Sequence, residues 1–243
     1  VSANTALTDL RCQENQLTAL DVSANTALTD LTCSDNPELY CIQVADVDQA
    51  QQDWADDISN WMGFSIDCDN YVPITYVPDD NFEQALIDLG YDDVLDDYVV
   101  IDSISGVTSL DVGEKEISDL TGIEAFTALT SLSCDQNQLT ELDVSANTAL
   151  TSLNCRNNQL TSLDVSNNTA LTDLRCYSND LTALDVSANT ALTYLSCYTN
   201  QLTALDVSAN TALSILKCYE NEIGNLDVSN NTALTELRCN GNG

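Results

Sequence analysis

Eight of the ten cysteines recur at a fixed spacing, so thiol chemistry is the first possibility that the sequence raises. A thiolate metal site would need converging cysteines or histidines, but the chain has no CxxC pair and no histidine. If the units stack as parallel strands, neighbouring thiols point the same way, which disfavours disulfides between them. Free thiols in an apolar core are therefore predicted, because cysteine packs as a small hydrophobe. The cysteines concerned are Cys12, Cys33, Cys134, Cys155, Cys176, Cys197, Cys218 and Cys239.

One aspartate also recurs in every repeating unit, which would stack like charges at the spacing of neighbouring strands. Bound calcium would relieve this repulsion, although EF-hand and RTX-type loops are absent from the sequence. Hydrogen bonds from backbone N–H groups of the next turn would relieve it as well, and this is the favoured interpretation, with no cofactor. The recurring residues are Asp143, Asp164, Asp185, Asp206 and Asp227.

The remaining carboxylates do not single out a catalytic pair. Among 39 acidic residues, nothing in the spacing selects two that would act together in hydrolysis, so the chain is predicted not to be an enzyme. Three pairs of adjacent aspartates are predicted to be solvated surface rather than a metal site. These pairs are Asp79 with Asp80, Asp92 with Asp93, and Asp96 with Asp97.

The charge balance excludes several classes of partner. The 39 acidic residues face only 6 basic ones, which gives a formal net charge of −33. A surface this negative repels phosphate backbones and anionic headgroups, so no nucleic-acid partner is expected. No apolar run is long enough for a transmembrane helix, so no membrane insertion is predicted for this segment.

The cysteine spacing is one sign of a 21-residue repeat. The stretch LTALDVSANTAL occurs identically at residues 17–28, 181–192 and 202–213, and a full unit reads LTSLSCDQNQLTELDVSANTA at 129–149. Its two similar halves, LxxLxCxxN and LxxLDVSxN, alternate apolar and polar residues, which predicts a short half-buried strand in each. A unit this short must stack with its neighbours as one coil of a solenoid. The side chains predicted inside one coil are Leu132, Cys134, Leu139, Leu142, Val144 and Leu150.

Two columns of asparagine accompany this core. A turning chain leaves backbone groups unpaired, and a buried Asn amide can supply both donors and acceptors there. The asparagines are therefore predicted to be structural. The columns are Asn137, Asn158, Asn179, Asn200 and Asn221, and Asn147, Asn168, Asn189, Asn210 and Asn231.

The nested pattern resembles the leucine-rich repeats, specifically the bacterial class with 21-residue units, LxxLxLxxNxLxxLDLxxN, known as the IRREKO class. The resemblance covers most of the chain, with Cys replacing the third Leu and Val replacing the Leu of LDL. It implies a leucine-rich-repeat solenoid of stacked parallel strands, mostly β and coil, with a small helical N-cap. It also implies that the strand face carries the ligand.

The period is interrupted between residues 37 and 103. The first part of this region resembles the C-terminal caps of secreted bacterial leucine-rich-repeat proteins, in which a Trp-containing loop covers the core. The prolines of YVPITYVPDD indicate an extended linker. The stretch DDNFEQALIDLGYDDVLDD predicts a helix with Asp80 as N-cap, Glu83 at N3 and Gly90 at its end. It looks like the N-terminal cap of a second array.

The expected order is the end of one array linked to the start of another. Residues 1–36 would be the last coils of the first array, 37–68 its C-terminal cap and 69–78 the linker. Residues 79–103 would be the helical N-cap and 104–243 the body of the second array. The register at the two ends fits one module of a longer tandem protein, with an arbitrary fragment as the alternative.

Cys41 and Cys68 lie outside the 21-residue period and bracket the region that resembles a C-terminal cap. They are therefore predicted to form a disulfide. A disulfide implies an oxidising compartment, so an extracellular or bacterial cell-surface location is expected.

The outward residues of LxxLxCxxN vary from coil to coil, whereas those of LTxLDVSxNTA hardly change. Tyrosine forms a column on the variable face, which also carries five of the six basic residues, Arg11 and Arg156 among them. Tyr and Arg anchor many recognition surfaces, so this face is predicted to bind a ligand. The alternative is that stacked rings stabilise neighbouring strands while the cations relieve acidic repulsion. The predicted ligand-binding residues are Arg175, Tyr177, Tyr194, Tyr198, Lys217, Tyr219 and Arg238.

The leading interpretation is a non-catalytic scaffold, extracellular or on a bacterial surface, that binds a protein or a glycan in adhesion. A second interpretation is structural: a module of a tandem-repeat surface fibre or filament, with copies of the chain assembled head to tail. A third is ice binding by a column of exposed threonines. These are Thr148, Thr169, Thr190, Thr211 and Thr232.

Overall fold

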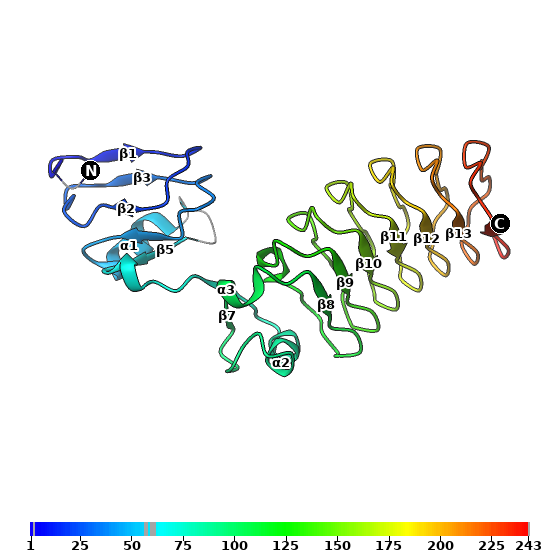
Figure 1. Ribbon diagram of the computed structural model, residues 1–243, viewed down its shortest axis with the longest axis horizontal. Helices are drawn as coiled ribbons and strands as arrows, with labels where there is room; N and C mark the ends of the chain where they lie inside the picture. The colour runs from blue at the N-terminus through cyan, green and yellow to red at the C-terminus, as the bar shows by residue number, and fades with distance from the viewer. Residues whose placement is uncertain (2, 56–57, 59–61, 243) are drawn as a thin grey trace. The chain divides into compact units, whose positions relative to one another are not determined.

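The computed structural model describes residues 1, 3–55, 58 and 62–242, and the chain divides into two compact units, Val1–Thr75 and Tyr76–Gly243. In each unit, consecutive coils contribute short strands to parallel sheets (Figure 1). The buried apolar residues form two separate clusters, one in each unit. Each unit therefore has a hydrophobic core of its own.

The first unit contains two small parallel sheets, one pairing β1 with β3 and the other in the order β2–β4–β5. Helix α1 packs against β3 and β5, and its N-cap Asp46 accepts a hydrogen bond from the Gln49 backbone at 3.1 Å. The elements are β1 (Asp9–Arg11), β2 (Leu20–Asp21), β3 (Asp30–Thr32), β4 (Cys41–Gln43), α1 (Val47–Trp54), β5 (Gly63–Ser65) and the 3-10 helix η2 (Cys68–Asn70).

A disulfide joins Cys41 of β4 to Cys68 of η2, the pair that the sequence predicts. Helix α1 and strand β5 lie in the loop that this bond closes. The Trp54 ring lies 6.2 Å from that of Phe64, so an aromatic pair packs at this end of the unit. The expected Trp-containing loop also includes Trp61, which lies outside the described residues.

The second unit is built on a parallel sheet of seven strands in the order β14–β13–β12–β11–β10–β9–β8. Two short strands, β6 and β7, and two helices precede it. The preceding elements are β6 (Ile74–Tyr76), α2 (Asp80–Asp88), β7 (Tyr98–Val100) and α3 (Ile101–Ile104). The sheet comprises β8 (Ser109–Asp111), β9 (Ser131–Ser133), β10 (Ser152–Asn154), β11 (Asp173–Arg175), β12 (Tyr194–Ser196), β13 (Ile215–Lys217) and β14 (Glu236–Arg238), with the 3-10 helix η3 (Ile123–Ala125) between β8 and β9.

The N-cap of helix α2 is Asp79, so the sequence-based assignment of Asp80 is wrong by one residue. The Asp79 backbone is extended, and its carboxylate accepts from the backbone N–H groups of Asn81 and Phe82, each at 3.0 Å. The expected capping box with Glu83 does not form, because Glu83 is buried and accepts from the Asp96 backbone instead. Gly90 follows the helix with a φ of +80°, a left-handed conformation that favours glycine.

Only the first half of each coil forms a strand in the described part of the second unit, so the prediction of two strands per coil is wrong there. In the other half, hydrogen bonds to side chains replace strand pairing. Asp143 Oδ1 accepts from the Ser145 backbone at 2.8 Å, and the bond recurs in the next four coils at 2.8–2.9 Å. Aspartate bonded to the backbone two residues ahead favours a turn over an extended strand.

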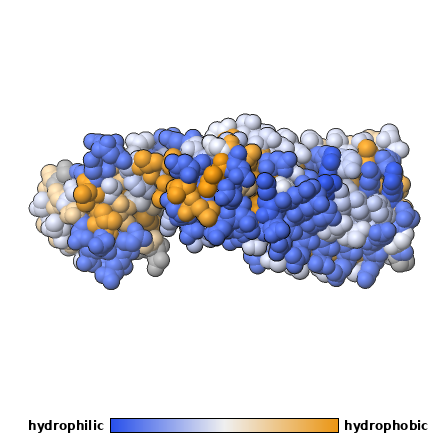
Figure 2. All heavy atoms as spheres, turned by 90° about the horizontal axis from the view of Figure 1, so that it is seen from below, coloured by the Kyte–Doolittle hydropathy of each residue, from blue (hydrophilic) through white to orange (hydrophobic). Residues whose placement is uncertain are grey.

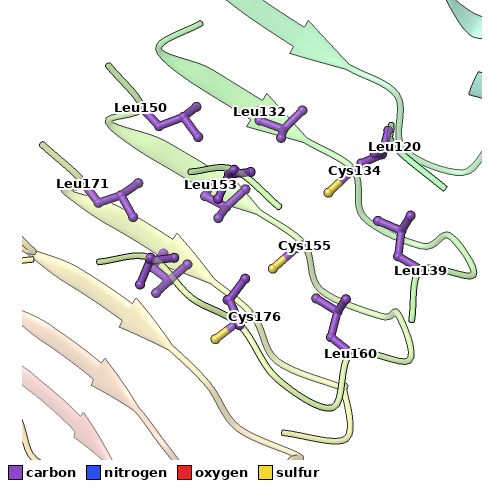
Figure 3. Packing of buried hydrophobic residues seen from close by; sticks show 14 of the residues in the cluster. Leu120, Leu132, Cys134, Leu139, Leu150, Leu153, Cys155, Leu160, Leu171 and Cys176 are labelled. Carbon is purple, nitrogen blue, oxygen red and sulfur yellow. The ribbon is translucent and has the colours of Figure 1, made fainter. Parts of the chain in front are cut away.

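The core of the second unit consists of columns of leucine, valine and cysteine, one residue per coil. Figure 3 shows Cys134, Cys155 and Cys176 in successive coils among the core leucines. Five of the six cysteines in this unit are fully buried, whereas Cys239 is exposed in the last described coil. Cys12 in the first unit is half-buried, and so is Leu142, so the core prediction is wrong for Cys12, Leu142 and Cys239 in this structure. Cys12 and Cys239 lie in the first and last coils that the structure describes, each shown with a neighbouring coil on one side.

The asparagine columns are buried, except for the half-buried Asn158 and Asn200, and are bonded as structural residues, but they act in two different ways. In the first column, Asn158 donates to the carbonyls of Cys134 and Cys155 and accepts from the Leu139 N–H. In the second, Asn168 donates to the carbonyls of Val144 and Asn147, but its Oδ1 has no hydrogen-bond partner among the described residues. The prediction that each asparagine amide both donates and accepts therefore holds for the first column only.

The surface is mainly hydrophilic, in agreement with the excess of acidic residues in the sequence. Hydrophilic residues cover most of the second unit on the face shown in Figure 2. Within the described residues, no three Asp, Glu, Cys or His side chains converge as they would to bind a metal ion. No described helix combines the length and the apolar character needed to cross a bilayer.

Candidate ligand-binding face

The parallel register aligns the outward residues of β9–β14 in columns. Each strand pairs with the next so that corresponding residues of the repeat lie side by side, for example Asp173 beside Tyr194 and Arg175 beside Ser196. A third column follows two residues after each strand. We call these three columns the strand face. They are Ser131, Ser152, Asp173, Tyr194, Ile215 and Glu236; Ser133, Asn154, Arg175, Ser196, Lys217 and Arg238; and Asp135, Arg156, Tyr177, Tyr198, Tyr219 and Asn240.

Three tyrosines of the third column form one stack, here called the tyrosine ladder. The ring centroids of Tyr177 and Tyr198 are 4.1 Å apart with an interplanar angle of 15°, and those of Tyr198 and Tyr219 are 4.2 Å apart at 10°. Centroids this close on nearly parallel planes mean that each ring covers a face of the next. The fixed 21-residue period produces the stack, because it returns the chain to the same position in each coil.

Burial raises the pKa of Tyr198, and hydrogen bonds with Tyr177 and Tyr219 raise it further. The central phenol of the ladder is therefore uncharged at neutral pH and keeps its O–H donor. Since all three rings are half-buried, each still presents part of its surface to solvent.

An ion pair extends the ladder at its N-terminal end. Arg156 donates from Nη1 to the Tyr177 hydroxyl at 2.6 Å and from Nε to Asp135 Oδ2 at 3.0 Å. Burial tends to raise the pKa of Asp135, but hydrogen bonds from Ser133, Arg156 and Gln136 outweigh it and keep the pKa below the ordinary value. The carboxylate therefore remains ionised and fixes the guanidinium against the first ring. The predicted site residues omit Arg156 and Asp135, although both occupy the tyrosine column of the repeat.

A second aromatic group forms around Tyr194. Arg175 lies over this ring at 5.0 Å from its centroid, and Lys217 lies at 5.4 Å. These cations come from the coils before and after Tyr194, so the ring lies between them. Cations over aromatic rings are attracted to the negative π face.

Each predicted cation of the face also pairs with a carboxylate. Arg175 donates to both oxygens of Asp173, at 3.0 and 2.9 Å. Lys217 and Arg238 share Glu236, at 3.7 and 2.6 Å. The structure thus brings six of the seven predicted residues into two groups, the ladder and the Tyr194 cluster, and joins Arg238 to them through Glu236. Each of these ion pairs places a cation beside a carboxylate of the same face.

A hollow of about 500 Å³ opens beside the N-terminal end of the ladder. Gly113 follows β8 at the position that corresponds to the third column. A Cβ there would lie 3.0 Å from Asp135 Oδ1, so its missing side chain leaves the space open. The lining carries charges of both signs. It comprises Asp111, Gly113, Glu114, Lys115, Asp135 and Arg156. Beyond the break in the column of larger side chains, nothing in the sequence indicates this hollow.

No family model matches the chain. Internalin J of Listeria monocytogenes serotype 4b (strain F2365) is 46% identical over 72 residues, which span 30% of this chain and 8% of internalin J. The functional domain of InlJ from Listeria monocytogenes, which includes a cysteine ladder, is 35% identical with a TM-score of 0.49 over 70% of this chain and 48% of that one. A Leptospira interrogans leucine-rich-repeat protein, LIC12759, aligns over 99% of this chain and 56% of its own, with 22% identity and a TM-score of 0.56.

The chain folds as a leucine-rich-repeat solenoid. Over 72 residues, the chain is homologous to internalin J, a bacterial protein. The chain spans 8% of internalin J and about half of the InlJ domain and of LIC12759, so the activity and partners of a whole protein of this kind are proposals for it. The assignment to the 21-residue IRREKO class rests on the sequence pattern alone.

Proposed function

We propose that this leucine-rich-repeat solenoid is a non-catalytic binding scaffold that captures a protein or glycan ligand on the strand face of its second unit. The observation that carries the proposal is the tyrosine ladder. It lies on the half of the repeat whose outward residues vary, while the other half repeats nearly unchanged. The inward residues of every coil must pack in the same way, which explains why they repeat. Variation confined to the outward residues of one face therefore indicates selection for a role other than packing.

The ladder also has the physical properties of a recognition surface. Tyr and Arg dominate the energetics of many interfaces, because they combine a large contact area with polar groups. Stacking and the Arg156 hydrogen bond already restrict the side chains before a ligand arrives. Binding then costs less conformational entropy than it would on a flexible surface.

The disulfide between Cys41 and Cys68 supports an oxidising compartment, and hence an extracellular or cell-surface location. On this proposal the first unit is the end of one array with its cap, and the second is the start and body of another. The boundaries at 37–68, 69–78 and 79–103 belong to the same proposal.

The test is a matched pair of double variants. Tyr198→Ser/Tyr219→Ser removes two rings of the ladder, and Tyr76→Ser/Tyr98→Ser removes another exposed pair, with centroids 5.5 Å apart, outside the face. Each protein is applied to a glycan array and to a displayed random-peptide library. We expect the ladder variant to lose binders that the wild type and the control variant retain, with affinity reduced about tenfold or more. Equal binding by all three proteins would contradict the proposal.

A further inference from the structure

The strand face is an exception in a strongly acidic molecule. It carries four cations against three carboxylates, while the rest of the chain carries two cations against the other acidic residues, 36 of the 39. Three of the four cations lie in the last four strands: Arg175, Lys217 and Arg238. The face is therefore the place where an acidic macromolecule meets the least repulsion.

The aromatic rings of this face are arranged against carbohydrate stacking. A pyranose stacks its C–H groups on an open aromatic face, where the π electrons are negative. In the ladder, Tyr198 has a tyrosine on both faces, and Tyr177 has Tyr198 on one side and Arg156 at 5.6 Å from its centroid. Tyr194 lies between two cations. Among the described residues, the second face of Tyr219 is the one ladder face with no ring or cation over it, so the ladder offers mainly ring edges and hydroxyl groups, which suit the hydrogen-bonding groups and side chains of a protein.

A buried hydroxyl lies at the centre of the cationic group. Ser196 is fully buried, and its Oγ has no hydrogen-bond partner among the described residues. By position it lies between Arg175 and Lys217 across the strands, and between Tyr194 and Tyr198 along the chain. A buried polar group without a partner is costly, so an added hydrogen-bond acceptor beside Ser196 would lower the free energy.

The two cations have donors left for such an acceptor. A guanidinium has five N–H donors, and Arg175 uses Nε and Nη2 on Asp173. Lys217 has three, and its contacts at 3.4 Å to the Tyr194 hydroxyl and 3.7 Å to Glu236 are long. A carboxylate placed between them would accept shorter, charge-assisted hydrogen bonds.

We infer that the ligand of the strand face is an acidic protein segment, which places a carboxylate side chain between Arg175 and Lys217 beside Tyr194 and contacts the tyrosine ladder along its edge. This inference rests on the proposed function. A basic partner would be attracted to almost any part of this surface, whereas an acidic one meets the least repulsion at this face. Repulsion from the wrong surface adds specificity to attraction at the right one.

The experiment selects binders to the full chain from a random-peptide library without any bias in charge. Recovered peptides should be enriched in Asp and Glu. Their affinity should fall about tenfold or more in Arg175→Gln/Lys217→Gln. The matched control Arg11→Gln/Lys115→Gln removes the same charge elsewhere and should bind as the wild type does. Far-UV circular dichroism confirms that the variants fold.

A second variant, in which both cations are replaced by carboxylates, tests the inference even if Arg175→Gln/Lys217→Gln does not fold normally. Peptides in which the selected Asp and Glu are replaced by Lys should bind Arg175→Glu/Lys217→Glu better than they bind the wild type. Peptides that need Tyr198 and Tyr219 but lack acidic enrichment would overturn the inference and leave the proposed function standing. Glycans that need these tyrosines for binding would also overturn the inference and leave the proposed function standing. If neither the peptide library nor the glycan array yields a binder that depends on the strand face, both proposals fail.

Discussion

Aspartate shows how one residue type acts differently according to its position. Asp143 and its equivalents are exposed and bonded to the serine two residues ahead, which lowers the pKa of Asp143 and stabilises a turn. Asp135 is buried and positions Arg156. Asp79 accepts from five groups: Asn81 N, Phe82 N, Ser118 N, Ser118 Oγ and Asp119 N. It therefore joins the first turn of α2 to the segment that leads into η3.

Replacing Asp79 with alanine should cost about 3 kcal/mol of the free energy of unfolding of the second unit, because buried backbone donors lose their acceptor. Asp80→Ala is the matched control, since Asp80 is exposed, and it should change stability by about 0.5 kcal/mol or less. Urea unfolding followed by far-UV circular dichroism measures both. Similar losses in the two variants would contradict the assignment of Asp79 as the cap.

The same site predicts a pH dependence. Burial tends to raise the pKa of Asp79, but hydrogen bonds from Ser118, Phe82 and Asp119 outweigh it and lower the pKa. A depressed pKa in the folded state gives stability that is present above the unfolded value, about 4, and lost as the pH falls through the folded value. The difference in stability between wild type and Asp79→Ala should therefore shrink as the pH falls below about 4.

At the scale of the element, each coil is stable only with its neighbours. The three-residue strands supply few hydrogen bonds. Backbone hydrogen bonds outside the strands also join adjacent coils, and the asparagine columns add more by donating to the coil before. Asn189 is fully buried and donates to the carbonyls of Val165 and Asn168, each at 2.9 Å. Because coils interact with their nearest neighbours, loss of one such residue weakens one interface of the stack.

Asn189→Ala should reduce the stability of the second unit by about 2 kcal/mol, since two buried carbonyls lose their donor. Asn167→Ala removes an exposed asparagine whose single contact, at 3.4 Å to the Ser145 carbonyl, is long, and should have little effect. Hydrogen exchange should show faster exchange in the coils on either side of Asn189. Unchanged protection there would exclude the column as a source of cohesion.

At the scale of the whole molecule, each unit has its own hydrophobic core and its own spectroscopic and covalent features, so the unfolding of the two units can be followed separately. The disulfide lies in the first unit, and both tryptophans, Trp54 and Trp61, belong to it as well. Tryptophan fluorescence therefore follows the first unit, whereas far-UV circular dichroism is dominated by the larger second unit.

Cys41→Ser/Cys68→Ser should destabilise the first unit by about 3.5 kcal/mol, the loop-closure entropy expected for the 27-residue separation. The unfolding midpoint from tryptophan fluorescence should fall, while the later circular dichroism transition should not move. Cys239→Ser, which removes an exposed free thiol from the second unit, is the control. If the midpoints of the fluorescence and circular dichroism transitions fell together, the two units would not unfold independently.

The sequence by itself determined the solenoid, its period and its inward residues, because a 21-residue repeat with fixed apolar positions has one way to bury them. It also predicted the pairing of Cys41 with Cys68 and the column of tyrosines. The tertiary structure decided what depends on atoms brought together from different coils. It moved the cap of α2 from Asp80 to Asp79, because only Asp79 reaches Ser118 and Asp119. It also turned the rings of the ladder face to face and placed Tyr194 between Arg175 and Lys217, since neighbouring coils, distant in sequence, meet there at strand spacing.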